Sequence, residues 1–393
     1  MLIIVAGILN MIACANNSSK NNLNKAKIIK IGVIEPQTGI YSSGGIQELS
    51  GIRYANQVYN VINIGGEEYK IELEEIDNES NKKNAIDVSK KIVDKNISAV
   101  IGSYGSDLSI AMGEYLKDAK IPAIACSNTN PQVTNGNEYY FRVCPTDPLQ
   151  AVVMSCYLAN SGYQNVAVIT QTDSMYSNDL GKFFVKACEK NNIDVVLQER
   201  IQDIENEMPN VLEDIKAKQP QFIYVPVEID IAAFIINEIG KQEISCLIGS
   251  GVAWENKSII ESLGNNTNDI VVTSFYEHNS QILKDERKDI VVENISLNDF
   301  SEYLLSNFNI ENIYSTSALG YDAYLAIYKA IELAQSTNRS DILEALKKIR
   351  FDGITGKVSF DIDRNVNINN KNFYIKRLEN NGFIVDDKIE LNN

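Results

Sequence analysis

Short apolar runs alternate along this chain with segments in which apolar residues recur every three or four positions. A strand is predicted at residues 28–34. The helix predicted from Gly45 carries its apolar residues on one face: Leu49, Ile52, Ala55, Tyr59 and Ile62. Further strands are predicted at residues 69–76, 97–101 and 121–125, and further helices at 82–95 and 108–119. This βαβα order predicts a mostly parallel sheet with helices on both faces.

The same alternation starts again after Thr146-Asp147-Pro148. Strands are predicted at residues 166–170, 195–197, 222–225, 246–249 and 270–274, and helices at 180–190, 211–218 and 231–240. Two more helices, at residues 317–334 and 340–348, precede short strands at 356–360 and 372–377. The pattern predicts an α/β fold with two doubly wound, Rossmann-like lobes that meet near Asp147 and again near Ser274.

The N-terminus combines a short apolar run with Met11-Ile12-Ala13-Cys14. This cysteine resembles that of a lipobox, where a signal peptide is removed and Cys14 is lipidated. The alternative is a buried strand with an incidental cysteine. The absence of Lys or Arg before Leu2 counts against a signal peptide, which usually begins with basic residues. The run is too short to span a bilayer. We expect a lipoprotein signal peptide at residues 1–14, a flexible tether at 15–27, and a location outside the cytoplasm, anchored to a bacterial membrane only by lipid.

Composition argues against several classes of function. The formal net charge is −16 and no Lys/Arg-rich block occurs, so nucleic-acid binding is not expected. The cysteines after Cys14 are far apart and form no C-x-x-C pair, so we interpret them as buried thiols. The single histidine, His278, removes Ser-His-Asp and Cys-His catalysis unless it acts alone, and we interpret it as a solvated loop residue. No catalytic residue, metal or cofactor is expected.

The segment from Val100 to Asp107 (VIGSYGSD) is the first candidate for binding. A strand ends in a glycine-containing loop, and Ser106 or Asp107 is predicted to cap the following helix. The first turn of a helix exposes unpaired backbone N–H groups, which suit an anion, and the Ser106 hydroxyl can add to them. Nucleotide fingerprints are absent, so a carboxylate is favoured. A plain helix cap is the alternative.

The second candidate is the segment from Cys126 to Pro131 (CSNTNP), which follows the strand predicted at residues 121–125. It carries free hydroxyl groups and leaves the same C-terminal edge of the sheet as the Ser106 loop. Ligands of open α/β sheets bind at that edge. A capped turn before a helix would explain the same residues.

Four stretches then carry a resemblance to a known family: residues 31–39 (IGVIEPQTG), 100–106, 121–131 and 351–361 (FDGITGKVSFD). In order and spacing they resemble type I periplasmic binding proteins, in particular the leucine/isoleucine/valine receptors of ABC transporters. The resemblance extends from about residue 27 to the end. It implies two lobes joined by a multi-strand hinge, with residues 28–147 and 275–353 in lobe 1, and 148–274 and 354–393 in lobe 2.

The resemblance also implies a set of ligand-binding residues between the lobes. Ser106 and nearby backbone N–H groups, including that of Gly105, would hold an α-carboxylate. The Ser127 carbonyl and Thr129, in one loop with Asn128, would take the α-ammonium and part of the carboxylate. Two tyrosines complete the set: Tyr176 would close over the ligand and Tyr104 would form an aromatic wall.

Departures from the family pattern leave the branched-chain specificity open. The first loop reads Ser43-Gly44-Gly45 where an aromatic residue is common, so Gly44 is expected to open space. The loop Gly249-Ser250-Gly251 lacks the acidic residue that commonly meets the ammonium group, and we hypothesise that Glu228 supplies that charge. An exposed loop acid is the alternative for Glu228. Two further family-like residues, Trp254 and Asp322, are expected to be structural.

The sequence therefore predicts an extracytoplasmic solute-binding lipoprotein of an ABC importer that binds an amino acid or similar small zwitterion by hinge closure. We expect a monomer, with an ABC permease as its membrane partner and no catalysed reaction. A ligand-sensing module that is not coupled to transport is the main alternative. An enzyme with a doubly wound fold is a further alternative, against which the missing nucleotide fingerprints and the single histidine argue.

Overall fold

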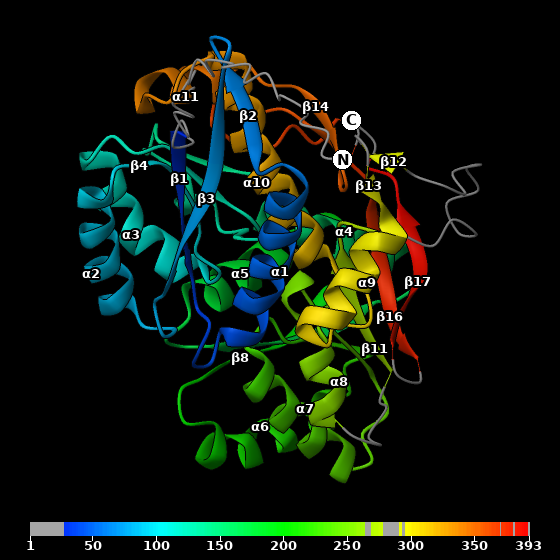
Figure 1. Ribbon diagram of the computed structural model, residues 1–393. Coiled ribbons are helices and arrows are strands. Elements are labelled where there is room, and N and C mark those ends of the chain that lie inside the picture. The colour runs from blue at the N-terminus through cyan, green and yellow to red at the C-terminus, as the bar shows by residue number, and fades with distance from the viewer. Residues whose placement is uncertain are drawn as a thin grey trace, which may run out of the picture.

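The computed structural model describes residues 27–263, 269–277, 291–292, 295–369, 371–379 and 382–391. Within these residues the chain forms two α/β lobes, each built around its own sheet (Figure 1). The predicted lipidation site Cys14, the tether before residue 27 and His278 lie outside the described residues. Among the described helices, none combines the length and the apolar character that crossing a bilayer would require.

The first sheet has the strand order β2-β3-β1-β4-β5-β6. Its strands are β1 (Lys27–Glu35), β2 (Val61–Ile64), β3 (Glu67–Asp77), β4 (Ile97–Gly102), β5 (Ala123–Ala125) and β6 (Tyr140–Arg142). All neighbours are parallel except β2 and β3, which form an antiparallel hairpin. The central strands are buried on both faces, which explains their nearly continuous apolar sequences.

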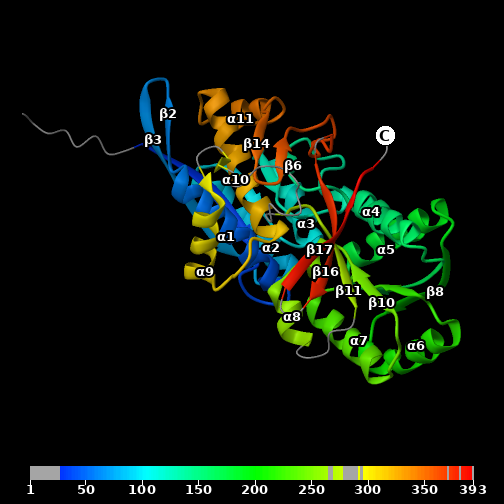
Figure 2. The same cartoon turned by 90° about the vertical axis from the view of Figure 1, so that its right-hand side faces the viewer.

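Helices cover both faces of this sheet. One face packs against α1 (Ser42–Val58), α9 (Leu297–Phe308) and α10 (Ser315–Ala334), and the other against α2 (Lys82–Ile92) and α3 (Ser106–Asp118). A last helix, α11 (Arg339–Leu346), contacts α10 and β4. Figure 2 shows α1, α9 and α10 side by side, although α1 lies far from the other two in the sequence.

The second sheet has the order β17-β16-β11-β10-β9-β7-β8. Five parallel strands form most of it: β7 (Asn165–Gln171), β8 (Asp194–Ile201), β9 (Phe222–Tyr224), β10 (Leu247–Ser250) and β11 (Ile270–Ser274). The C-terminal strands β16 (Phe373–Glu379) and β17 (Gly382–Ile389) extend the sheet in antiparallel fashion. The C-terminal strands of the chain therefore belong to the second lobe.

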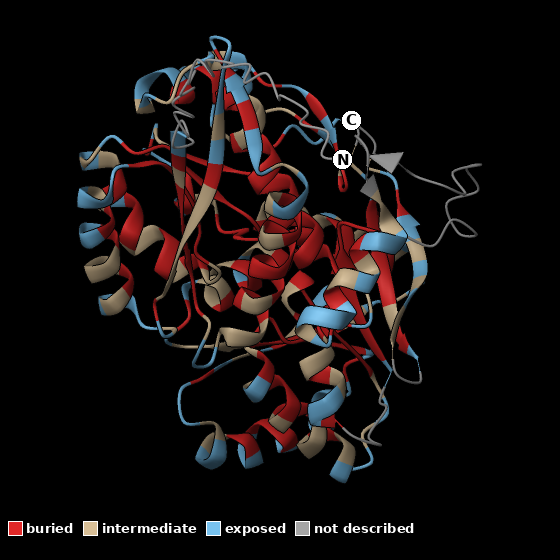
Figure 3. Cartoon of the chain, in the orientation of Figure 1, coloured by how far each residue is buried: buried red, intermediate tan, exposed pale blue. Residues whose placement is uncertain are grey.

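The helices of the second lobe also lie on both faces of its sheet. The helices α4 (Asp147–Asn160) and α5 (Met175–Lys190) share an apolar core that continues into the first lobe. The helices α6 (Ile204–Lys218), α7 (Ile229–Lys241) and α8 (Lys257–Leu263) enclose a separate core on the opposite face. Buried residues accordingly follow the strands and the inward faces of the helices (Figure 3).

The hairpin formed by β14 (Phe351–Gly353) and β15 (Gly356–Val358) contains the G-x-T-G motif and packs on the first lobe. The buried carboxylate of Asp322 accepts hydrogen bonds from the backbone N–H groups of Ile354 at 2.7 Å and Thr355 at 3.0 Å. A Cβ atom at Gly353 would lie 2.4 Å from that carboxylate, which explains the glycine. The predicted lobe boundary between residues 353 and 354 falls inside this hairpin. We propose a boundary near residue 371 instead.

One predicted helix extends too far. The helix that begins near Gly45 ends at Val58, and Ile62 lies in strand β2 rather than on the helix. Residues 61–64 alternate between exposed and buried positions, and Gly65 and Gly66 take positive φ values of 59° and 85° in the turn that follows. A two-residue glycine turn of this kind favours an antiparallel hairpin, so the β2–β3 pairing replaces the last helical turn.

Candidate ligand-binding site

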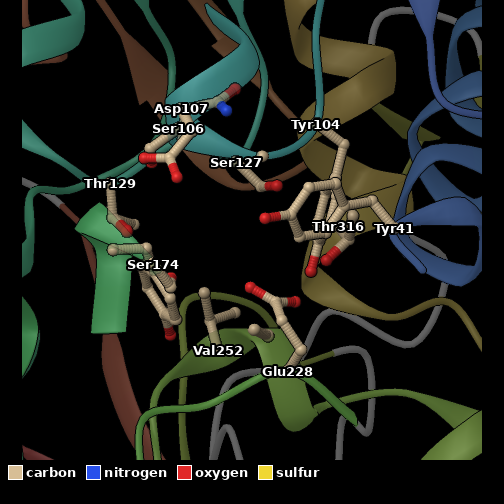
Figure 4. Close-up of a pocket in the computed structure, with 14 residues that line it drawn as sticks. Tyr41, Tyr104, Ser106, Asp107, Ser127, Thr129, Ser174, Glu228, Val252 and Thr316 are labelled. Carbon is tan, nitrogen blue, oxygen red and sulfur yellow. The ribbon is translucent and has the colours of Figure 1, made fainter. Parts of the chain in front are cut away.

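A pocket lies between the two lobes, at the C-terminal ends of the central strands of the first sheet. It encloses about 470 Å³ of space not filled by protein atoms, part of it open to solvent. All eight residues that were predicted to bind a ligand line this pocket: Tyr104, Gly105, Ser106, Ser127, Asn128, Thr129, Tyr176 and Glu228. The first six come from the first lobe, and Tyr176 and Glu228 from the second. Figure 4 shows Ser106 and Ser127 of the first lobe on the opposite side of the open space from Glu228 of the second.

Six further lining residues were not predicted to bind: Tyr41, Asp107, Ser174, Val252, Ala253 and Thr316. Asp107 is the last residue of the candidate segment that starts at Val100, and Tyr41 lies two residues before the loop Ser43-Gly44-Gly45, so position in the sequence was a usable signal for both. Val252 and Ala253 follow the glycine loop after β10, where the family pattern leads one to look for an acidic residue. Thr316 lies at the start of α10, and no local signal connects it to the pocket.

The N-terminus of α3 points at the pocket. Gly105, with a φ of 89°, is the residue before the helix, and its carbonyl accepts the N–H groups of Leu108 and Ser109. The N–H groups of Ser106 and Asp107 therefore precede the first hydrogen bonds of the helix and are available to an anion. Neither Ser106 nor Asp107 caps the helix as predicted, because Ser106 is its first residue and Gly105 forms no side-chain cap.

The loop after β5 is anchored from behind. The N–H group of Ser127 donates to the buried carboxylate of Glu48 at 3.0 Å, and the Ser127 hydroxyl donates to the same oxygen. The Thr129 carbonyl accepts the N–H group of Asp147 at 2.8 Å. The side chain of Asn128 is buried, and its amide has no partner among the described residues. The Ser127 hydroxyl is therefore not free as expected, whereas the buried amide of Asn128 has no partner among the described residues.

The aromatic wall consists of Tyr41 and Tyr104, whose ring centroids lie 6.3 Å apart in an edge-to-face arrangement. The space beside Gly44 is not empty as expected. A Cβ atom at Gly44 would lie 2.2–2.5 Å from carbon atoms of the Tyr104 ring, so this ring occupies the space that Gly44 provides. Tyr41, which precedes the glycines by a few residues, supplies an aromatic residue to the first loop in place of the one that the family pattern shows.

Glu228 extends from the second lobe into the pocket, opposite Ser127 (Figure 4). It directly precedes α7, and its chain segment is held by the Trp254 indole, which donates to the Val227 carbonyl at 2.8 Å. Trp254 is fully buried and structural, as expected. Burial, reinforced by the charges of Asp107 and Asp230, raises the pKa of Glu228 to about 8. Glu228 is therefore a carboxyl group at the pocket rather than an exposed loop acid.

Tyr176 is the other predicted residue from the second lobe. Its hydroxyl is buried, has no partner among the described residues, and lies beside Gly251. A Cβ atom at Gly251 would come within 2.5 Å of that hydroxyl, so the glycine loop leaves room for the tyrosine. Burial raises the pKa of Tyr176, which therefore stays neutral and can donate a hydrogen bond.

Two polar contacts join the lobes beside the pocket. The Asp107 carboxylate accepts the N–H group of Met175 at 3.4 Å, and the Asn130 amide donates to Asp179 at 3.0 Å. Asp107 lies in the first turn of α3 and Asn130 in the loop after β5, both in the first lobe. Their partners, Met175 and Asp179, both belong to α5 of the second lobe. The structure therefore has its lobes in contact across the pocket.

Comparisons with known proteins agree with this architecture. The family model described as periplasmic binding protein matches residues 28–382. A leucine-binding protein of Thermotoga maritima superposes with a TM-score of 0.81 at 26% identity, over 92% of this chain and 98% of that one. A branched-chain amino-acid transporter substrate-binding protein of Streptococcus pneumoniae, in complex with isoleucine, gives 0.78 at 23% identity, over 92% and 99%.

In sequence alone, an amino acid binding protein of Pseudomonas aeruginosa is 32% identical over 200 residues, which are 50% of this chain and 53% of that protein. The match thus spans about half the length of that relative. The predicted two-lobed architecture is confirmed, and the family consists of binding proteins rather than enzymes, as the sequence analysis expected. With a family model that spans nearly all of the described residues, this chain belongs to the periplasmic binding proteins.

Proposed function

We propose that this protein binds an amino acid, or a similar small zwitterion, between its two lobes. The observation that carries this proposal is that groups suited to an anion and a group suited to a cation lie on opposite sides of one pocket. The start of α3 offers N–H groups and the Ser106 hydroxyl on one side, and Glu228 offers a carboxyl group on the other. An α-carboxylate suits the helix start, and an α-ammonium group suits a carboxylate.

The charges around the pocket also favour a ligand that is neutral overall or carries a net positive charge. Its described lining contains the carboxyl groups of Asp107 and Glu228 and no Lys, Arg or His. A ligand with a carboxylate side chain would meet these two acids without a cationic partner. We therefore expect weak binding of aspartate and glutamate compared with neutral amino acids.

The ligand side chain would lie among groups of mixed character. Val252, Ala253 and the rings of Tyr41 and Tyr104 provide apolar surface, whereas Asn128 provides an amide with no partner among the described residues. A buried amide that stays unpaired costs about 1–3 kcal/mol, so a ligand with its own polar group gains an advantage here. Small polar amino acids therefore rank with the branched-chain ones as candidates.

Ligand binding would be coupled to hinge closure, and the bound ligand would then be transported. The contacts Asp107–Met175 and Asn130–Asp179 support a closed form, which ligand would favour by its greater affinity for that form. We propose that the protein is monomeric, anchored through Cys14 outside the cytoplasm, and delivers its ligand to an ABC permease. Family membership and the lipobox-like sequence support this role.

A thermal-shift screen of residues 27–393 against amino acids, amides and short peptides tests the proposal. A ligand at about 100 times its dissociation constant stabilises the folded state by roughly 2.7 kcal/mol, which appears as a clear rise in melting temperature. At least one amino acid should produce this rise and should bind with a 1:1 stoichiometry in calorimetry. If no amino acid stabilises the protein but a ligand without an ammonium group does, the proposal is wrong.

A further inference from the structure

Two buried glutamates lie directly behind the pocket. The carboxylate of each accepts a backbone N–H group from one of the two pocket-lining loops of the first lobe. Glu35 ends strand β1 and accepts the N–H group of Tyr104 at 2.6 Å. Glu48, in helix α1, accepts the N–H group of Ser127 at 3.0 Å together with the Ser127 hydroxyl. Both glutamates have 0% exposure. Each glutamate side chain therefore holds one of the loops that line the pocket by accepting a backbone N–H group of that loop.

The remaining oxygens of this pair have no ordinary partner. Glu35 Oε1 and Glu48 Oε2 are buried and lack a hydrogen-bond partner among the described residues. Carboxylate oxygens of both residues and the sulfur of Cys126 lie within 4.8 Å of one another. Two carboxylates this close cannot both stay ionised in a low-dielectric interior, as the two aspartates of aspartic proteases illustrate. A counter-charge between them is required.

A proton fits this position better than a metal ion. Backbone N–H groups already point at both carboxylates, and the site is tightly packed, since a Cβ atom at Gly102 would lie 2.5 Å from Glu35 Oε1. The titratable groups that face the pair are weak acids whose pKa values burial raises, so they stay neutral: Cys126, Cys144, Tyr104 and Tyr140. The counter-charge at hand is therefore a proton.

The proton resides mainly on Glu35. Burial and then the charge of Glu48 raise the pKa of Glu35 well above its ordinary value, and a single N–H donor opposes them. Burial also raises the pKa of Glu48, but the hydrogen bonds from Ser127 and from Glu35 lower it. Glu48, with more donors, is thus the better anion, and protonated Glu35 can donate to it.

We propose that Glu35 and Glu48 share one proton and act together as positioning residues. They fix the loop after β4, through Tyr104, and the loop after β5, through Ser127, at the positions that the ligand requires. The proton itself does not depend on the proposed function; only the effect on ligand affinity does. A glutamine at position 35 can replace protonated Glu35, because its carbonyl accepts from Tyr104 and its NH₂ group donates to Glu48. Glutamines at both positions would place two NH₂ groups against each other.

The proton is tested without ligand. The infrared difference spectrum of wild type minus Glu35→Gln should contain the carbonyl band of one protonated carboxylic acid at neutral pH. Taking the difference matters because burial raises the pKa of Asp147, Asp322 and Glu228 as well. The exposed variant Glu67→Gln is the control and should leave the band in place. A spectrum in which Glu35→Gln also leaves the band unchanged would overturn the shared proton.

Stability against pH gives a second readout of the proton. The pKa of Glu35 is raised in the folded state, so the unfolded chain releases this proton near its ordinary pKa while the folded chain keeps it. Wild type should therefore lose stability with rising pH above the ordinary carboxyl pKa, with a slope one proton steeper than that of Glu35→Gln. Equal slopes in the two proteins would contradict the proposal.

Positioning is tested by amide hydrogen exchange and by ligand affinity. The Tyr104 and Ser127 amides should be protected in wild type and in Glu35→Gln, and should exchange at least tenfold faster in the double variant Glu35→Gln/Glu48→Gln. Affinity for whichever amino acid binds should fall at least tenfold in the double variant and less than threefold in Glu35→Gln. Unchanged exchange in the double variant would refute positioning. Failure of amino acids and other small zwitterions to bind would refute the proposed function and leave the exchange result standing.

Discussion

Asn130 and Asp179 face each other across the two lobes, with the amide nitrogen of Asn130 3.0 Å from a carboxylate oxygen of Asp179. Asn130 belongs to the loop after β5 that also carries Ser127, Asn128 and Thr129, and Asp179 lies in α5 of the second lobe. The contact therefore couples a pocket-lining loop of one lobe to a helix of the other. Such a contact exists only while the lobes are together, so its energy favours the closed form.

Replacement of Asp179 by alanine should weaken ligand binding without unfolding the protein. A single hydrogen bond to a charged group contributes about 1.5–3 kcal/mol, so affinity should fall roughly tenfold to hundredfold, mainly through faster dissociation. Stopped-flow or surface-based kinetics measure this directly. The matched control is Lys182→Ala, which removes the exposed ion pair of Asp179 and leaves the contact with Asn130. Equal effects of the two variants would argue against a closing role for the contact.

Gly44→Ala should damage the pocket through Tyr104. Because the new Cβ atom would lie within 2.5 Å of the ring, the ring must move, and the aromatic wall moves with it. We expect at least a tenfold loss of ligand affinity with a modest loss of stability of about 1–3 kcal/mol from overpacking. Gly382→Ala, at a position with no atom within 4 Å, is the control and should bind normally. Calorimetry of both variants decides the matter.

Glu228→Gln should separate affinity from stability. Loss of the charged partner of an ammonium group is expected to cost about 1.5–3 kcal/mol of binding energy, a tenfold to hundredfold drop in affinity. The folded-state pKa of Glu228 lies above its unfolded value, so this group lowers stability as pH rises towards about 8. The melting temperature of the free variant at pH 7 should therefore equal or exceed that of wild type. As a control, Glu213→Gln on the exposed face of α6, away from the pocket lining, should leave affinity unchanged.

Affinity for a zwitterion should depend on pH through the same carboxyl group. The ligand ammonium favours ionised Glu228 and lowers its pKa from about 8, so binding releases a proton. Affinity should rise by up to about tenfold for each pH unit between pH 6 and 8 and level off above, as long as the ligand ammonium stays charged. Calorimetry at several pH values tests this. The dependence should vanish in Glu228→Gln, and persistence there would assign it to another group.

Asp322→Ala should act on stability alone. Its carboxylate holds the β14–β15 hairpin through Ile354 and Thr355, and the amine of Lys371 contacts Thr355 beside it. Removal leaves buried donors unpaired, and we expect about 3–5 kcal/mol of destabilisation in denaturant titrations. Asp322→Asn keeps one acceptor and should lose less. A large drop in ligand affinity of the folded variant would contradict a purely structural role.

Much of the fold could be predicted because most strands are central and parallel. Such strands are buried on both faces, as in β4, and their continuous apolar sequences stand out from amphipathic helices. The end of α1 could not be placed by helical spacing alone, because Ile62 fits that spacing as well as it fits the β2 edge strand. The lobe boundary that we propose near residue 371 depends on contacts between distant segments, such as that of Asp322 with Thr355, which a local sequence pattern does not reveal.

The candidate site was predicted as a set of residues but not as a geometry. Sequence pattern and resemblance led to the loops after β4 and β5, and the structure brings all eight predicted residues to one pocket. Their roles towards a ligand stay predictions. Glu35 and Glu48 escaped notice because charged residues in a strand and a helix are usually exposed, and only tertiary packing shows that both are buried. Tyr41 was not predicted to line the pocket because it lies a few residues before Ser43-Gly44-Gly45, where the family pattern has an aromatic residue.

The most direct measurement compares one amino acid with its analogue that lacks the α-amino group, by calorimetry on wild type and Glu228→Gln. If the pocket recognises a zwitterion, wild type should bind the amino acid at least tenfold more tightly than the analogue, and Glu228→Gln should remove most of that difference. Equal affinity of wild type for both compounds would contradict zwitterion recognition by the helix start and Glu228.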